Sequence, residues 1–90
     1  MTSQMMPKIR VTVLYFAQIH ETTRKKQEII ELSTNTSVKD LISIILTKHP
    51  NIKNIKNVKI SVNCHIINTN SNPILKNDDE VALLPPISGG

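Results

Sequence analysis

Glycine is scarce in this chain of 90 residues. Average usage of about 7% predicts about six glycines in a chain of this length, whereas the sequence has two, Gly89 and Gly90, which are its last residues. The turns before them must therefore be built without glycine. Asparagine, which is abundant here, suits this role because it tolerates left-handed backbone angles.

Cysteine, aromatic residues and long apolar runs are scarce as well. The one cysteine, Cys64, excludes an internal disulfide and a metal site built from several cysteines of one chain. No apolar run approaches the roughly 20 residues that cross a bilayer. Residues 1–7 lack a hydrophobic segment of signal-peptide type, so we expect a cytoplasmic protein without a membrane segment. Because Tyr15 and Phe16 are the only aromatic residues, Ile, Leu and Val must supply the core.

Alternating apolar residues predict several strands. From Ile9 to Phe16 every second residue is apolar, and the other face becomes apolar at Leu14 and Phe16. Further strands are predicted over residues 27–32, 58–62 and 81–84, and another short one begins at Ile66–Ile67. Residues 17–26 are interpreted as a connection and residues 51–57 as a loop. Residues 1–7 are expected to be disordered, with a folded domain over residues 8–84 and a tail over residues 85–90.

One helix is predicted between the second and third strands. Ser37, with Asp40 three residues later, resembles a capping box, and Pro50 ends the helix. The apolar stripe follows helical spacing and consists of Val38, Leu41, Ile42, Ile45 and His49. The order of elements predicts an α+β roll in which a mixed sheet is covered on one face by the helix. The sequence leaves open whether the first and last strands are neighbours.

The chain ends in Leu84-Pro85-Pro86-Ile87-Ser88-Gly89-Gly90. Proline has no backbone N–H, so the sheet ladder cannot continue beyond Leu84, and two prolines favour a stiff polyproline-II segment. The two glycines lack Cβ atoms and can pass through a channel only as wide as the backbone. The last group is an accessible carboxylate, a poor electrophile that becomes reactive only after activation, most simply by adenylation with ATP on a separate enzyme.

Residues 79–90 resemble the C-terminus of the small, sulfur-carrier subunit of molybdopterin synthase. The resemblance continues at residues 13–17, 38–41, 49–50 and 61–63, and so spans residues 8 to 90. It implies a ubiquitin-like β-grasp fold. This chain departs from many relatives at two glycine positions, since it has Asn77-Asp78 before its acidic turn and Arg24 after the first strand's loop. Asparagine can adopt the same left-handed angle as glycine, so the Asn77-Asp78 pair is compatible with the turn.

The resemblance also implies a function. A ubiquitin-activating-like adenylyltransferase and sulfurtransferase would adenylate the carboxylate of Gly90 and convert it to a thiocarboxylate (1-thioglycine). The tail would enter the active site of the large synthase subunit, where its sulfur would pass to cyclic pyranopterin monophosphate to form the molybdopterin dithiolene. This chain would be a non-catalytic sulfur donor in a heterotetramer of two small and two large subunits. The implied partner surface, beside the tail residues Pro85, Pro86, Ile87, Ser88 and Gly89, consists of Phe16, Ile66, Leu84 and Ile87.

Two rival functions share the tail. One is a sulfur carrier for thiamine or for tRNA thiolation, and the other is a ubiquitin-like protein modifier. The Pro-Pro-Ile-Ser sequence before Gly89 favours the molybdopterin carrier over the other carriers. A modifier would appear as isopeptide conjugates, whereas a carrier would appear free with sulfur at its C-terminus. A non-enzymatic interaction module is a third class, which an inert C-terminus would support.

The remaining polar residues indicate no second site. Cys64 and His65 are adjacent, so on a strand they point to opposite faces and cannot form a nucleophile–base pair. His20 and His49 lack the spacing of metal ligands, and residues 78–80 are interpreted as a solvated acidic turn. Five lysines and no acids lie between Leu41 and Asn77, and the net charge is +4. Without aromatic stacking platforms, these lysines indicate a solvated face rather than a nucleic-acid interface.

Overall fold

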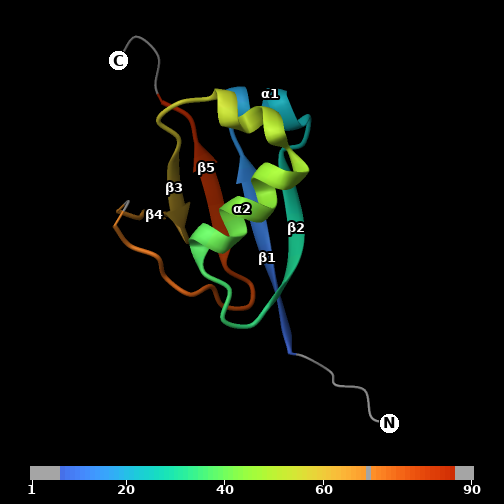
Figure 1. The fold of residues 1–90 in the computed structure, drawn as a ribbon, viewed down its shortest axis with the longest axis vertical. Helices are drawn as coiled ribbons and strands as arrows, with labels where there is room; N and C mark the ends of the chain where they lie inside the picture. The colour runs from blue at the N-terminus through green and yellow to red at the C-terminus, as the bar shows by residue number, and fades with distance from the viewer. Residues whose placement is uncertain (1–6, 69, 87–90) are drawn as a thin grey trace.

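The computed structural model describes residues 7–68 and 70–86 (Figure 1). Within them the chain forms five strands, two α-helices and one 3-10 helix. In chain order these are β1 (Lys8–Tyr15), α1 (Ala17–Thr23), β2 (Gln27–Ser33), α2 (Val38–Lys48), η1 (Pro50–Asn54), β3 (Lys59–Val62), β4 (His65–Ile66) and β5 (Glu80–Leu84). Residues 1–6, the predicted disordered N-terminus apart from Pro7, lie outside the described residues.

The strands form one mixed sheet in the order β2-β1-β5-β3-β4. β1 and β5 are parallel neighbours, paired from Thr12 with Glu80 to Tyr15 with Leu83, and the other pairs are antiparallel. This settles the pairing that the sequence left open. β5 lies at the centre of the sheet, and three of its residues, Val81, Ala82 and Leu83, are buried. The predicted α+β roll is confirmed, and it has the β-grasp arrangement that the resemblance implies.

The core lies between the sheet and α2, which crosses one face of it (Figure 1). The predicted alternation along β1 is confirmed, because its four alternating apolar side chains are all buried: Ile9, Val11, Val13 and Tyr15. From α2 they meet Val38, Leu41 and Ile45, which are also buried. The remaining side chains of each strand point to the opposite face of the sheet, which α2 does not cover.

The capping box that begins α2 is confirmed. The Ser37 hydroxyl accepts a 3.1 Å hydrogen bond from the backbone N–H of Asp40, and an Asp40 carboxylate oxygen accepts one of 3.4 Å from the N–H of Ser37. These bonds satisfy two donors at the helix start that have no partner within the helix. At the other end, His49 is the C-cap and Pro50 begins η1.

Two predicted connections contain short helices. Residues 17–26 were expected to lack regular structure, but residues 17–23 form α1, which buries Ile19 completely. Likewise, η1 occupies part of the predicted loop over residues 51–57 and buries Ile52. Each helix has a single aliphatic anchor, which is too little to produce a helical apolar pattern in the sequence. The short strand predicted to begin at Ile66 begins at His65 and ends at Ile66.

Left-handed backbone angles occur without glycine in the described residues. Asn35, Asn57 and Asn63 have φ between 50° and 71°, as expected for asparagine-built turns. In the Asn77-Asp78 pair, Asp78 rather than Asn77 takes the positive φ, of 70°. Asn77 instead uses its side-chain oxygen to accept a 2.9 Å hydrogen bond from the N–H of Arg10. Arg24 also has a positive φ, of 64°.

Candidate functional site

β5 leads directly into the tail. Leu84 is its last residue, and the partly buried Pro85 and exposed Pro86 lie beyond the ladder, which fits the lack of a proline N–H. Ile87, Ser88, Gly89 and Gly90, which the sequence analysis assigned to the tail and its reactive end, lie outside the described residues. The described part of the site is therefore the surface around the end of β5.

The strand register aligns side chains in rows on the open face of the sheet. Leu14 is paired with Ala82, Ala82 with Ser61, and Ser61 with Ile66. This row crosses β1, β5, β3 and β4 on the face opposite α2, because its members alternate with buried neighbours such as Val13 and Val81. Its middle residues are small, so the row is a shallow surface bounded by two larger aliphatic side chains.

A second row lies beside the first at the tail end of the sheet. Leu84 is paired with Lys59. Phe16 follows β1 with an extended backbone, so its side chain continues the alternation and lies on the face of Leu14. Phe16 is 45% exposed and Ile66 is 61% exposed, and apolar side chains that gather on one exposed face are more informative than scattered ones. We call Leu14, Phe16, Ile66, Ala82 and Leu84 the open-face patch.

The open-face patch contains three residues that the sequence analysis assigned to a partner surface. The structure places Phe16, Ile66 and Leu84 on one face of the sheet, whereas Ile87 is outside the described residues. An exposed apolar surface of this kind suits docking to another protein, where a few apolar anchors supply most of the affinity. Its position at the end of β5 puts any docked partner next to the start of the tail.

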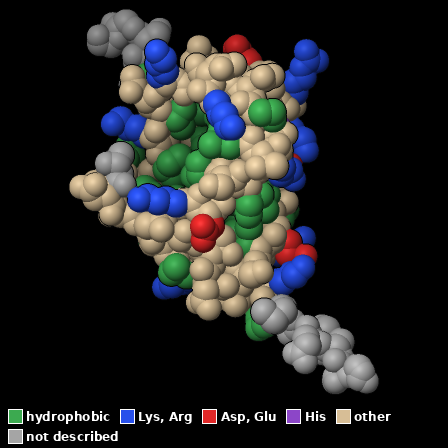
Figure 2. Space-filling model, viewed as in Figure 1, with side chains coloured by type: hydrophobic (Ala, Val, Ile, Leu, Met, Phe, Trp, Pro, Cys, Tyr) green, Lys and Arg blue, Asp and Glu red, His purple; other side chains and the backbone are tan. Residues whose placement is uncertain are grey.

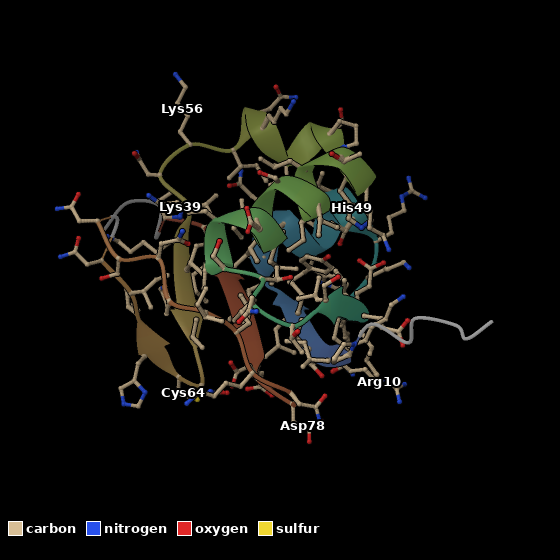
Figure 3. The ribbon with its side chains drawn as sticks, turned by 60° about the horizontal axis from the view of Figure 1, so that its bottom comes forward. Arg10, Lys39, His49, Lys56, Cys64 and Asp78 are labelled. Carbon is tan, nitrogen blue, oxygen red and sulfur yellow. The ribbon has the colours of Figure 1, made fainter. Side chains whose placement is uncertain are left out.

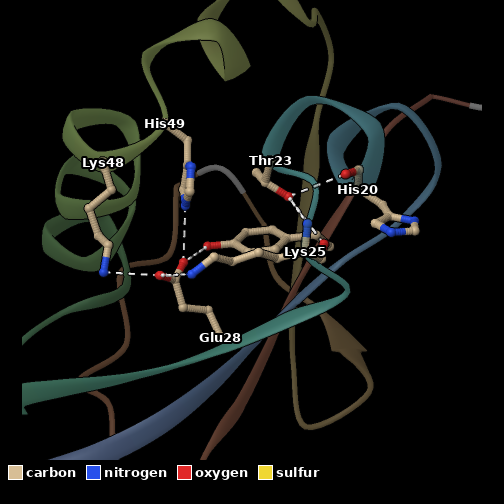
Figure 4. Close-up of polar contacts among 7 residues, drawn as sticks. His20, Thr23, Lys25, Glu28, Lys48 and His49 are labelled. Carbon is tan, nitrogen blue, oxygen red and sulfur yellow. Dashed lines mark hydrogen bonds and ion pairs between the residues drawn. The ribbon is translucent and has the colours of Figure 1, made fainter.

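A partly buried carboxylate on the helix side of the sheet was missed by the sequence analysis (Figure 4). The Glu28 side chain is 9% exposed and has three close partners. The Tyr15 hydroxyl donates to its Oε1 at 2.7 Å, Nε2 of His49 lies 3.1 Å from the same oxygen, and Nζ of Lys48 lies 3.0 Å from Oε2. Lys25 adds a weaker contact at 3.4 Å.

These contacts control the ionisation of Glu28. Burial opposes its negative charge, but the hydrogen bonds from the three partners outweigh that cost and lower its pKa to about 2. The pKa of Tyr15 is raised, first by burial and then by its hydrogen bond to the carboxylate. Because an ionised carboxylate only accepts hydrogen bonds, Nε2 of His49 must carry the hydrogen. The cluster connects β1 and β2 to the end of α2, which is a structural role.

The other polar candidates form turns rather than a reactive centre. Cys64 is exposed, and Nδ1 of His65 contacts the Asn63 carbonyl oxygen at 3.0 Å. Asp79 accepts hydrogen bonds from the side chain of Asn63 and the backbone N–H of Lys76. Among the described residues, no three His, Cys, Asp or Glu side chains are grouped so that they could hold a metal ion. In the same part of the chain, no helix is long and apolar enough to cross a membrane.

Comparison with known proteins identifies relatives that match nearly the whole chain. The ThiS family matches residues 13–90. The human (Homo sapiens) molybdopterin synthase sulfur carrier subunit is 33% identical over 88 residues, which cover 96% of this chain and 100% of the human protein.

Solved structures agree with this result. Molybdopterin converting factor subunit 1 from Pyrococcus furiosus is 30% identical with a TM-score of 0.77, covering 88% of this chain and 99% of that one. A chain in the complex of subunits 1 and 2 of the Helicobacter pylori molybdopterin-converting factor is 30% identical with a TM-score of 0.62, covering 91% of this chain and 100% of that one. This chain therefore belongs to the ThiS family and, within it, to the molybdopterin synthase sulfur carrier subunits.

Proposed function

We propose that this chain carries sulfur on the carboxylate of Gly90 and delivers it to the large subunit of a molybdopterin synthase. The observation that best supports this is the open-face patch next to the end of β5, where Pro85 and Pro86 leave the sheet. A partner docked on the patch has the tail within reach of its own active site. The family match extends through residue 90, so it includes the tail.

The chemistry of Gly90 requires three steps before sulfur delivery. A carboxylate oxygen attacks the α-phosphate of ATP on an adenylyltransferase, which releases pyrophosphate and forms a glycyl adenylate. The terminal sulfur of a persulfide then displaces AMP, and a thiol cleaves the resulting acyl disulfide to leave the thiocarboxylate. ATP is thus a co-substrate of the activating enzyme, and this chain needs no nucleotide site of its own.

Sulfur delivery is proposed to occur in the large subunit. There the thiocarboxylate passes its sulfur to cyclic pyranopterin monophosphate, and two such transfers build the dithiolene of molybdopterin. The catalytic residues belong to the large subunit, and the assembly contains two small and two large subunits. The Helicobacter pylori complex supports a partner of this kind, since it joins subunits 1 and 2 of the corresponding factor.

The experiment that tests this function is reconstitution. The purified chain with Gly90 as its last residue is incubated with an activating enzyme, ATP and a persulfide donor, and then with the large subunit and cyclic pyranopterin monophosphate. The expected results are a mass increase equal to replacement of one oxygen by sulfur, its loss on addition of the large subunit, and formation of molybdopterin. Isopeptide conjugates on other proteins would instead support the modifier, and sulfur delivery only to thiamine precursors or tRNA would support the other carriers.

A further inference from the structure

A groove on the helix side of the sheet takes no part in the proposed sulfur transfer. It lies between the first turns of α2 and the edge formed by β3 and β4, and its volume is about 730 Å³, which is within the range of about 300–1,000 Å³ typical of binding pockets. In Figure 2 hydrophobic side chains form the floor of a hollow on this face. The apolar residues lining the groove are Val38, Ile42, Val58, Ile60, Ile66 and Ile67.

The charged groups of the groove are all positive. Lys39 from α2 and Lys59 from β3 line it, and its other polar residues are the neutral Asn57, Asn68 and Ser71. Among the described lining residues there is no acid, and within residues 7–68 and 70–86 neither lysine forms an ion pair. Figure 3 shows Lys39 at the start of α2, whereas Lys56 points away from the body of the molecule. Lys59 is paired with Leu84, so its side chain starts on the open face of the sheet and borders the groove only at the β3 edge. The apolar floor is thus combined with one unneutralised cation on the helix side, Lys39.

We propose that this groove binds a short segment of a partner protein in which aliphatic side chains are flanked by carboxylates. The aliphatic side chains would cover the floor, where burial of apolar surface stabilises binding by about 25 cal/mol per Å². A carboxylate would lie against Lys39, and this complementarity of charge selects an acidic segment over a neutral one. The proposal does not rest on the function of Gly90.

Other occupants fit the groove less well. A second copy of this chain would bring the lysines of two grooves together on a protein whose net charge is already +4, which is unfavourable for association. A nucleic acid would use the lysines, but single-strand binding also needs aromatic side chains on which bases stack. The lining has none, because Tyr15 and Phe16 are both outside it.

The groove and the open-face patch share one residue, Ile66. The rest of the groove is formed by α2, the residues from Asn57 to Ile60, and Ile67, Asn68 and Ser71. An acidic segment can therefore occupy the groove while another protein covers Phe16 and Leu84. Because both partners would contact Ile66, binding of one should affect binding of the other. The groove is thus a second docking surface that overlaps the open-face patch only at Ile66.

The test uses the full chain and a synthetic peptide of leucines flanked by glutamates. Amide chemical shifts in a ¹⁵N-labelled sample should change mainly at Ile42, Val58 and Ile67. Lys39→Glu should weaken binding by about fivefold or more, because repulsion replaces attraction. The matched control is Lys56→Glu, which makes an equivalent charge change outside the groove and should alter affinity by less than about twofold. Added salt should weaken binding to the unaltered chain, which tests the charge contribution without any substitution.

Several results would overturn the proposal. The first is absence of binding at about millimolar peptide. The second is a control peptide, with lysines in place of the glutamates or serines in place of the leucines, that binds as tightly as the original peptide. The third is a set of chemical-shift changes confined to the open-face patch. Binding of decanoate but not of the peptide would make the groove a site for small amphiphiles. Shift changes at groove residues that depend on protein concentration alone would make it a contact between copies of this chain.

Discussion

The hydroxyl of Tyr15 donates a 2.7 Å hydrogen bond to the carboxylate of Glu28, which His49 and Lys48 contact from the end of α2. The rings of Tyr15 and His49 also meet edge to face, with centroids 5.7 Å apart. Two neighbouring strands and the helix that covers them are thus joined at one ionised group. Stability of the domain should therefore depend on the charge of Glu28.

We predict that the domain loses stability in acid through Glu28. Its pKa is lowered from 4.5 to about 2 in the folded chain, so the folded state favours the ionised form. The contribution is fully present above the unfolded pKa near 4.5 and is lost as the pH falls towards 2. Urea unfolding at a series of pH values should show this loss. Glu28→Gln should flatten the pH dependence in this range and lower the free energy of unfolding by about 1–3 kcal/mol near neutral pH.

Glu31→Gln is the matched control for this prediction. Glu31 lies on the same strand, but its side chain is 60% exposed and pairs with Lys8 across the surface at 3.6 Å. An exposed pair of this kind contributes about 0–1 kcal/mol. If Glu31→Gln removed as much acid sensitivity as Glu28→Gln, the cluster would not be the main source of the effect.

Tyr15→Phe should raise the pKa of Glu28 while preserving the core. The variant keeps the buried ring but removes the hydroxyl that donates to the carboxylate. We expect the free energy of unfolding to fall by about 1–2 kcal/mol, and carboxyl NMR titration should show Glu28 protonating at a higher pH than in the unaltered chain. An unchanged titration would mean that His49 and Lys48 hold the charge without the tyrosine.

Arg24→Gly should stabilise the domain. Arg24 has a φ of 64° at the C-cap of α1, a conformation that costs a residue with a Cβ atom roughly 1 kcal/mol or more and costs glycine little. Part of this gain is offset by the greater freedom of glycine in the unfolded chain, so we expect a net gain of about 0.5 kcal/mol. Arg24→Ala keeps the Cβ atom and should not produce it. Denaturant midpoints of the three proteins provide the comparison.

Phe16→Arg or Leu84→Arg should weaken binding to the large subunit by about ten- to a hundredfold, because each places a charge in the open-face patch. Adenylation of Gly90 should continue, since the tail is unchanged. Ile44→Arg is the matched control, because Ile44 is a 38% exposed isoleucine on α2, on the other side of the sheet. Isothermal titration measures the affinity. Equal loss in the control would show that a general surface effect, rather than the patch, is responsible.

The sequence predicted the parts of this protein that follow local periodicity. The alternation from Ile9 to Tyr15 and the capping box at Ser37 both depend on residues a few positions apart, and both were confirmed. The helix α1 was missed because Ile19 is its only buried apolar residue. Such a segment becomes helical by packing against the rest of the domain, which no local pattern records.

The Glu28 cluster could be anticipated only in part. Glu28 alternates with Ile30 and Leu32, which are buried, so the period of two places its side chain on the inward face. Its partners Tyr15 and His49 are 13 and 21 residues away in the chain. Tyr15 and His49 contact Glu28 only because β1 pairs with β2 and α2 ends close to them. These arrangements are properties of the complete fold, which local sequence patterns do not reveal.

The length of the tail should be as important as its composition. We predict that deleting Gly90, or adding one residue after it, abolishes sulfur transfer while the fold remains intact, because the reactive carbon is then missing or displaced along the channel. Circular dichroism checks the fold, and the reconstituted synthase reaction checks transfer. Gly89→Ala keeps the length but adds a Cβ atom, so it should slow transfer less than either length change. Molybdopterin formation by a length variant at the unaltered rate would refute this mechanism.

The most direct test of sulfur carriage is intact-protein mass spectrometry of this chain isolated from its own cells. A fraction of the molecules should carry one sulfur in place of one oxygen, located by fragmentation at Gly90, and this fraction should disappear when the activating enzyme is removed. Molecules that never carry the sulfur, even when the large subunit is absent and cannot discharge them, would contradict the account.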